Sequence, residues 1–259
     1  MRLEALLFVN WIFWAGLAAG TLLVVGLTEL LGGTTRGYRL FMAWVLVGLA
    51  ALLVASDLGL PSDAQGSATA ALRRPLTMAF AAGCVAYLVA SIARWPRAAL
   101  AVGTGLVGLG ALVALAAAGG TRSAPLFAGQ LVLAALALGA VTAAMLLGHW
   151  YLVTPKLSPA PLRRMMWFLI ACLVLQALAF GLALLLLGGE ALAGGIGWLT
   201  WLRLAVGILL PIGITVLAML ASRAASLQAS TGLLYIGLAL IMAGSIAGAS
   251  ITYLTGVPV

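Results

Sequence analysis

The fold class is already visible in one segment, Ala98–Ala118, which reads AALAVGTGLVGLGALVALAAA. The segment contains no charged residue. About 20 such residues form a helix long enough to cross the roughly 30 Å hydrocarbon core of a bilayer. Because the apolar residues are continuous and do not alternate, they predict a helix and not a strand of a membrane barrel.

Segments of this kind fill most of the chain. Its mean hydropathy is +1.24, and 7% of its residues are charged, whereas water-soluble domains have about 25%. No soluble domain fits between the apolar segments, so residues 1–259 are predicted to form one all-α membrane domain of eight transmembrane helices. The seven further helices are expected at Ala5–Leu31, Tyr38–Leu60, Leu76–Trp95, Pro125–Val153, Met166–Leu187, Trp198–Ala221 and Thr231–Leu254.

Glycine and proline mark the breaks between these segments, because both residues end helices through their backbone geometry. The shortest break, Trp95-Pro96-Arg97, predicts an antiparallel hairpin of the third and fourth helices. The longest, Gly59–Pro75, has the composition of a surface loop. Two motifs of small residues, Gly16-x-x-x-Gly20 and Gly244-x-x-x-Gly248, predict close contacts between helices and a tight bundle.

The net charge of +8 is interpreted as a topology signal and not as a nucleic-acid site. An eight-helix topology places eight basic residues on the side of the odd-numbered connections and five on the side of the termini. Since cytoplasmic loops carry the excess of lysine and arginine, both termini are predicted to lie outside. The first group is Arg36, Arg39, Arg94, Arg97, Lys156, Arg163, Arg164 and Arg223, and the second is Arg2, Arg73, Arg74, Arg122 and Arg203.

Few residues are available to hold a cofactor. The chain has one histidine, His149, and two cysteines, Cys84 and Cys172, in different predicted helices. A bis-histidine haem or an iron–sulfur cluster needs more ligands than these. The chain alone is therefore expected to hold no haem, no iron–sulfur cluster and no metal.

Polar residues near the outer side form a first candidate site. Asp57 is expected to pair with Arg203, because each lies near a helix end on that side. A pocket with a few polar groups and aromatic walls suits a quinone head group. The alternative, which the sequence slightly favours, is that the two charges extend to water at the interface. The full set of candidate quinone-binding residues is Asn10, Asp57, Gln130, Trp198, Trp201 and Arg203.

A second candidate site lies near the cytoplasmic side, where Glu29 and His149 each lie about one turn from the end of a predicted helix. If the first and fifth helices are neighbours, the carboxylate and the imidazole could form a proton relay. Trp150 and Tyr151 follow the histidine directly. The sequence favours the simpler interpretation that all three belong to an aromatic belt at the membrane surface.

The first helix reads Trp11-Ile12-Phe13-Trp14-Ala15-Gly16-Leu17-Ala18-Ala19-Gly20-Thr21. This aromatic stretch running into Gly-Leu-Ala-Ala-Gly resembles the first helix of NrfD-type and polysulfide-reductase-type membrane anchors. Residues 123–139 are similar to another helix of that group. The resemblance implies a haem-free subunit that exchanges electrons or protons between menaquinol or ubiquinol and a peripheral redox subunit carrying haem or iron–sulfur centres.

Three function classes follow from the sequence. The leading one is a quinone-binding subunit of a respiratory or electron-transfer complex in a bacterial-type inner membrane, with no role for nucleic acid. The second is a small-solute or lipid transporter, or a purely structural anchor; against transport, the sequence shows no clear internal repeat and only Pro211 in the middle of a helix. The third, a lipid-modifying membrane enzyme, lacks paired acids or a histidine cluster.

Overall fold

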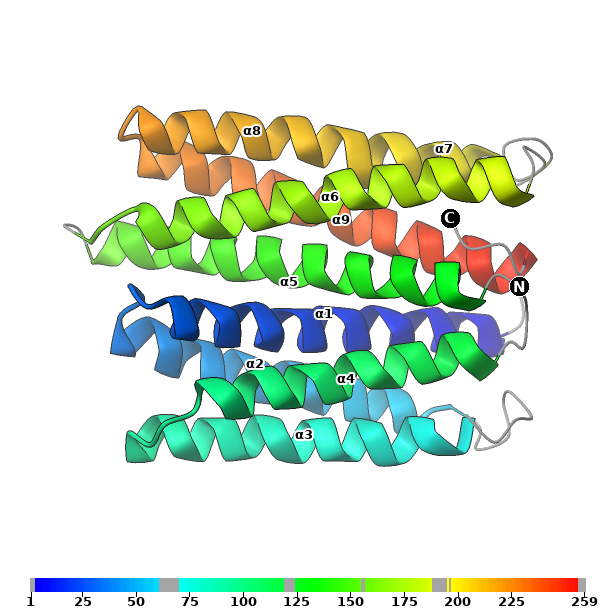
Figure 1. Cartoon of the computed structure of the whole chain (residues 1–259), viewed down its shortest axis with the longest axis horizontal. Helices are drawn as coiled ribbons and strands as arrows, with labels where there is room; N and C mark the ends of the chain where they lie inside the picture. Colours follow the sequence, from blue (N-terminus) through cyan, green and yellow to red (C-terminus); the bar gives the residue numbers. More distant parts are fainter. Residues whose placement is uncertain are drawn as a thin grey trace.

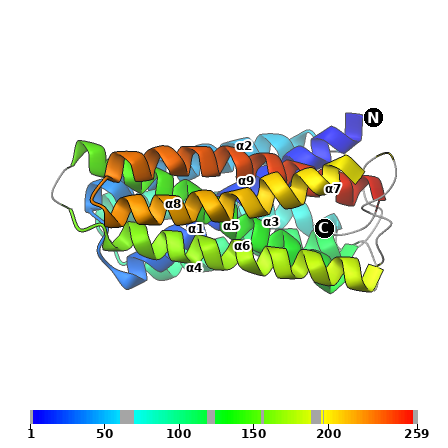
Figure 2. The same ribbon diagram turned by 90° about the horizontal axis from the view of Figure 1, so that it is seen from above.

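A computed structural model describes residues 3–60, 70–118, 124–154, 157–187, 195 and 197–255. These residues form helices and connections without a strand, and eight helical segments are long and apolar enough to cross a membrane. The prediction of an all-α bundle with eight membrane spans is confirmed, and the chain is a multi-pass membrane protein in contact with the lipid bilayer. Helix α1 begins and helix α9 ends at the same end of the bundle, as Figure 1 and Figure 2 show from two sides.

The first four helices pack as one up-and-down half of the molecule. They are α1 (Leu3–Leu31), α2 (Arg36–Leu58), α3 (Ala70–Ala93) and α4 (Ala98–Ala118). The predicted α3–α4 hairpin is confirmed, since four residues separate the two helices and they pack against each other. α1 ends where predicted because Gly32 and Gly33 adopt positive φ angles of 70° and 96°, which glycine tolerates best.

The remaining spans form the second half. They are α5 (Ala124–Val153), α6 (Ala160–Leu187), a seventh span made of α7 (Gly197–Leu204), the π-helical turn η2 (Ala205–Leu209) and α8 (Leu210–Arg223), and finally α9 (Leu227–Thr255). Figure 1 shows the two halves one above the other, with α1 and α5 side by side at their junction.

The two halves pack in the same pattern. α1 contacts α2 and α4 just as α5 contacts α6 and α9, and across the junction α4 contacts α5 just as α9 contacts α1. α1 and α5 run in the same direction because four spans separate their starts. The molecule therefore contains two equivalent four-helix halves, although no repeat is evident in the sequence.

Glycine allows the helices to touch along their backbones at two places. A Cβ atom on Gly20 would collide with the Ala135 carbonyl group of α5, and one on Gly139 would collide with the backbone of Gly20. Likewise, a Cβ atom on Gly207 of η2 would collide with the backbone of Gly244 of α9, and one on Gly244 would collide with the backbone of Gly207. The predicted close contacts at Gly20 and Gly244 are confirmed, whereas Gly16 is only in ordinary contact with Ala135.

Three helices start four or more residues before the predicted position, namely α3, α6 and α9, and α9 begins at Leu227 instead of Thr231. α3 begins at Ala70, so Pro75 lies inside it and Arg73 and Arg74 are helical. α6 begins at Ala160, six residues before the predicted start. The differences at α3 and α6 arise because a proline near the start of a helix interrupts few backbone hydrogen bonds. Pro211 is thus not the only proline inside a helix.

Charge is distributed unequally between the two ends of the bundle. Among the described residues, the end that α1 reaches at Leu31 carries seven arginines, and the end where α1 begins carries three. The first group is Arg36, Arg39, Arg94, Arg97, Arg163, Arg164 and Arg223, and the second is Arg73, Arg74 and Arg203.

This asymmetry predicts that the seven-arginine end faces the cytoplasm. Alkaline phosphatase fused after Val259 should be active in a bacterial host, because that enzyme folds only outside the cytoplasm. A green fluorescent protein fusion at the same position serves as the complementary reporter and should be dark. A fluorescent, phosphatase-negative result would show the opposite orientation.

Candidate functional site

A small cavity whose mostly apolar wall contains a few polar groups lies inside the bundle, at the end where α1 begins and α9 ends. Helices α1, α4, α5, α7 and α9 all contribute to it, so it sits where the two halves meet. Its volume is about 30 Å³, which is room for one or two water molecules. Its walls are Ile12, Phe13, Gly16, Leu112, Phe127, Gln130, Leu131, Ala134, Ala135, Leu138, Arg203, Ser245, Gly248, Ala249 and Thr252.

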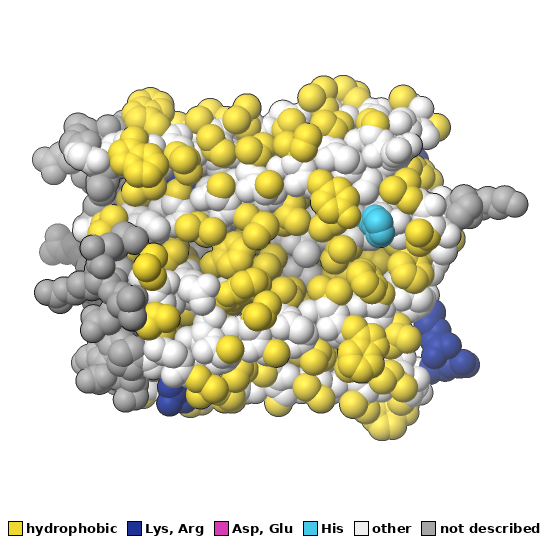
Figure 3. Space-filling view, turned by 180° about the vertical axis from the view of Figure 1, so that it is seen from behind, with side chains coloured by type: hydrophobic (Ala, Val, Ile, Leu, Met, Phe, Trp, Pro, Cys, Tyr) yellow, Lys and Arg dark blue, Asp and Glu magenta, His cyan; other side chains and the backbone are white. Residues whose placement is uncertain are grey.

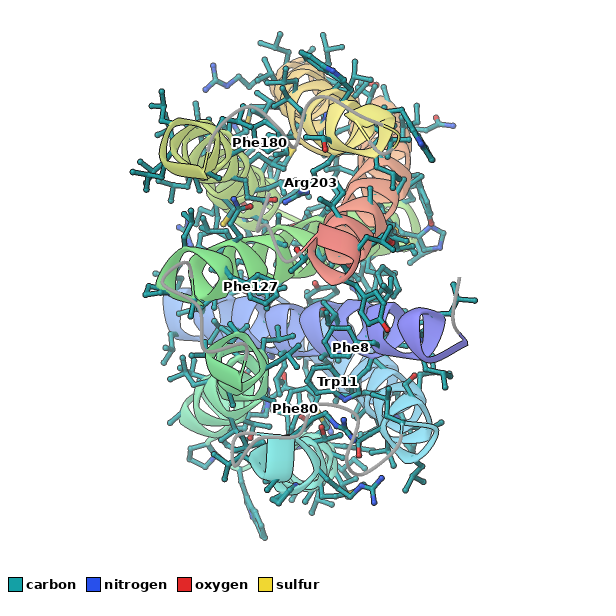
Figure 4. The ribbon with its side chains drawn as sticks, turned by 90° about the vertical axis from the view of Figure 1, so that its right-hand side faces the viewer. Phe8, Trp11, Phe80, Phe127, Phe180 and Arg203 are labelled. Carbon is teal, nitrogen blue, oxygen red and sulfur yellow. The ribbon has the colours of Figure 1, made fainter. Side chains whose placement is uncertain are left out.

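Arg203 supplies the charge in this cavity. Its side chain lies among α5, α6, α7 and α9, as Figure 4 shows from the end of the bundle, and the residue is 2% exposed. Its Nη2 atom donates a hydrogen bond of 2.6 Å to Oε1 of Gln176, whose Nε2 atom in turn donates one of 3.2 Å to the Leu133 carbonyl oxygen. The guanidinium is therefore held in place by a neutral amide and not by a carboxylate.

Several polar atoms around the cavity have no hydrogen-bond partner within the described part of the chain. They are Nε and Nη1 of Arg203, both amide atoms of Gln130, and Oγ of Ser245. Gln130 is 4% exposed. Buried polar groups are nearly always hydrogen-bonded to protein or ordered water. Donors and acceptors gathered without partners around one cavity therefore mark a place where a polar ligand or water can bind.

The first half of the molecule satisfies its own buried arginine differently. Arg73 lies in the first turn of α3, as Arg203 lies in the second turn of α7, and it is 4% exposed. Its Nε atom donates to Oδ1 of Asp57 at 2.8 Å, and Arg74 contacts Oδ2 of the same carboxylate at 3.1 Å. The buried arginine of the first half is thus neutralised by Asp57, whereas within the described residues the side-chain partner of Arg203 in the second half is the neutral Gln176.

The expected pairing of Asp57 with Arg203 is wrong. Asp57 is fully buried against Arg73 and Arg74, and it does not line the cavity. The sequence does not predict the pairing of Asp57 with Arg73 and Arg74, because the composition of residues 59–75 indicates a loop and not the start of a helix. The early start of α3 is what brings the two arginines to the last turn of α2.

The structure brings together two of the six candidate quinone-binding residues, Gln130 and Arg203. Asn10 lies elsewhere: its Nδ2 atom donates to Oγ of Ser56 at 2.8 Å, and its Oδ1 atom accepts from Trp14. Trp198 and Trp201 are 63% and 54% exposed and do not line the cavity, as is typical of tryptophan at a membrane surface.

The expected pairing of Glu29 with His149 is also wrong. Helices α1 and α5 are neighbours, as the hypothesis required, but Glu29 faces the first half. It accepts a hydrogen bond of 2.7 Å from the Tyr87 hydroxyl and contacts Nε of Arg97 at 3.2 Å and of Arg39 at 4.0 Å. His149 is exposed on the outer surface, where Figure 3 shows the single histidine among apolar side chains.

The seventh span is irregular directly beside Arg203. The π-helical turn η2 begins two residues after it and ends just before Pro211, the second residue of α8. Proline has no N–H to donate to the carbonyl four residues earlier and crowds that carbonyl, so the helix widens there. Such π-helical turns occur frequently at functional sites.

Three residues at or beside the cavity are missing from the candidate site that the sequence predicts: two line the cavity and one binds Arg203. Gln176 lies near the middle of its helix, Ser245 is a small hydroxyl, and Phe127 is one of many aromatic residues. The signal that could have found Gln176 is its position, since an amide at mid-membrane depth needs a polar partner from a neighbouring helix. Its partner, Arg203, follows from that requirement only once the packing of α6 against the seventh span is known.

Comparison with protein-family models, with curated proteins and with solved structures finds no match for this chain.

Proposed function

We propose that this protein is a haem-free membrane subunit of a respiratory or electron-transfer complex, and that it binds the head group of a quinone or quinol at Arg203 and Gln130. The observation that carries the proposal is the set of unpaired polar atoms around an arginine that no carboxylate of the described residues contacts. A quinone carbonyl can accept from Nε or Nη1 of Arg203, and a quinol hydroxyl can donate to Oε1 of Gln130.

The apolar walls of the cavity suit such a ligand. Phe13 and Phe127 flank the polar groups, and aromatic walls are typical of sites for flat ligands. The cavity of about 30 Å³ is smaller than a quinone ring, so binding requires side chains to move. Phe127 is a large wall residue that is only half-buried, so its ring has room to move. Menaquinone and ubiquinone share the carbonyl pair that these groups would recognise.

Partners complete the proposed function. A bound quinone would supply two-electron, two-proton chemistry, and the chain's own residues would bind it and exclude water. Electrons would pass to or from a peripheral subunit with haem or iron–sulfur centres, as the resemblance of Trp11–Thr21 to NrfD-type anchors implies. The proposed location is the inner membrane of a bacterial-type cell, where such complexes operate.

A small-solute transporter is the second candidate. The two equivalent halves favour it, because parallel repeats related by an axis along the membrane normal are common in transporters. The backbone contact of Gly20 with Gly139 argues against it, since it closes the junction between the halves at mid-helix depth. Solute uptake into vesicles that contain only this protein would favour the transporter.

Gln176→Glu is the variant that separates a ligand site from a merely structural arginine. The new carboxylate would stand 2.6 Å from Arg203 and would give it the counter-charge that Asp57 gives Arg73. Quinone affinity, measured by isothermal titration with the protein in lipid nanodiscs, should fall about ten- to a hundredfold, because charge-assisted hydrogen bonds contribute about 1.5–3 kcal/mol.

The control is Gln228→Glu, an exposed glutamine of α9 that does not line the cavity. It adds the same charge at the opposite end of the bundle and should leave the quinone affinity unchanged. Equal affinities of the wild type and of Gln176→Glu, with both proteins folded, would contradict a ligand role for Arg203.

A further inference from the structure

An apolar groove lies at the opposite end of the bundle from the cavity at Arg203. It runs between the last two turns of α1 and the first turns of α6, and its volume is about 240 Å³. Val24, Leu27 and Leu31 form one wall, and Met165 and Phe168 form the other. The groove on the flank of the bundle is thus larger than the cavity inside it, which has about 30 Å³.

The groove has a polar mouth and an apolar interior. Nη1 of Arg164 donates a hydrogen bond of 3.3 Å to the carbonyl oxygen of Leu31, the last residue of α1. Val24 lies seven residues earlier in the same helix, which is about 10 Å deeper at 1.5 Å per residue. The guanidinium therefore marks the membrane surface, and the apolar wall extends from it toward the middle of the bilayer.

The groove is open to its surroundings. Leu30 and Leu31 are 61% and 65% exposed, and Arg164 is exposed as well. No carboxylate within the described residues contacts Arg164. The one described acid at this end, Glu29, is already bound by Tyr87 and Arg97. Arg164 is therefore a cation that no acid in the described part of the chain neutralises, at the head of an apolar groove.

We propose that this groove binds an anionic phospholipid, with an acyl chain along the apolar walls and the phosphate group on Arg164. The charge of the site matches the head group, and the order of groups along the groove matches the lipid: charge at the membrane surface and hydrocarbon below it. Arg36 and Arg163 at the same end add positive potential that attracts anionic lipids. This lipid site is independent of the quinone site, because it lies at the other end of the bundle.

The test compares two lipids on the purified full-length protein in detergent. Native mass spectrometry would count bound phosphatidylglycerol and phosphatidylcholine for the wild type, for Arg164→Gln and for Arg223→Gln. The wild type should bind more phosphatidylglycerol than phosphatidylcholine. In Arg164→Gln the ratio of the two should fall about fivefold, since a basic residue at the surface contributes about 1 kcal/mol. Arg223→Gln, an exposed arginine outside the groove, is the matched control and should retain it.

A second variant tests the apolar part. Leu27→Trp would fill the groove without changing its charge and should lower the binding of the phosphatidylglycerol acyl chain. Equal losses in Arg164→Gln and Arg223→Gln would show diffuse attraction to a basic surface and would overturn the proposal. Displacement of the lipid by a quinone analogue, or unchanged binding to Leu27→Trp, would overturn it as well.

Discussion

Gly139→Ala is expected to prevent the two halves of the molecule from joining. The added Cβ atom would collide with the carbonyl group of Gly20 and with the amide nitrogen of Thr21, all of which are backbone atoms that no rotamer change can move. In membranes, helices associate largely through close packing of this kind. The loss of stability should exceed about 4 kcal/mol, a range reserved for severe packing defects.

The measurement is the yield and thermal stability of the purified protein in a mild detergent. Gly129→Ala provides a control in the same helix, because a Cβ atom there meets no atom within 4 Å. Alanine is the better helix former by roughly 0.5–1 kcal/mol, so this variant should be as stable as the wild type or more so. Equal stability of the two variants would contradict a backbone contact between α1 and α5.

Asp57→Asn is expected to destabilise the first half strongly. It removes the negative charge from a carboxylate that two arginines share, and it leaves the buried Arg73 without a counter-charge. Breaking a buried ion pair on one side typically costs about 3–5 kcal/mol. The thermal unfolding of the variant in detergent should therefore occur at a markedly lower temperature, and less protein should accumulate in membranes.

Arg74→Gln is the matched variant for this prediction. The Arg74 side chain is 44% exposed, and exposed ion pairs contribute only about 0–1 kcal/mol. Its effect should be small, while that of Asp57→Asn is large. Similar melting temperatures for Asp57→Asn and the wild type would contradict a neutralising role for the carboxylate and would return Asp57 to the list of ligand-binding candidates.

The sequence predicts the spans well because hydropathy and helix length alone determine them. Residues such as Gly32, Gly33 and Pro96 end helices through backbone geometry, so they can be recognised without knowledge of the neighbours. The contacts at Gly20 and Gly244 could be predicted because each belongs to a Gly-x-x-x-Gly motif, a pattern typical of helices that approach closely in membranes.

The pairing of charges could not be predicted from the sequence. Glu29 and His149 lie on neighbouring helices at the same end, but the carboxylate faces α3 and the α3–α4 connection while the imidazole faces outward. The direction in which a side chain points depends on how each helix is rotated in the bundle, and apolar residues surround these helices on most sides. The error at Asp57 has another cause, because Pro75 suggested a helix start later than the observed one.

The repeated arrangement of the two halves was hidden for a physical reason. Helix packing in lipid requires small and apolar residues at the contacts, and many sequences meet that requirement. The halves therefore share their packing pattern without sharing motifs. One difference between the described residues of the two halves appears only in the structure: Arg73 pairs with Asp57, whereas Arg203 binds Gln176 and lines a cavity.

The most direct measurement of the central claim is photoaffinity labelling of the purified protein by an azidoquinone, followed by mass spectrometric mapping of the modified peptides. The proposed function predicts labelling of α5 around Phe127–Gln130 and of the seventh span around Arg203, reduced by excess unlabelled quinone and lost in Arg203→Leu. Labelling confined to the lipid-facing surface, or labelling that Arg203→Leu leaves unchanged, would contradict a quinone site at this cavity.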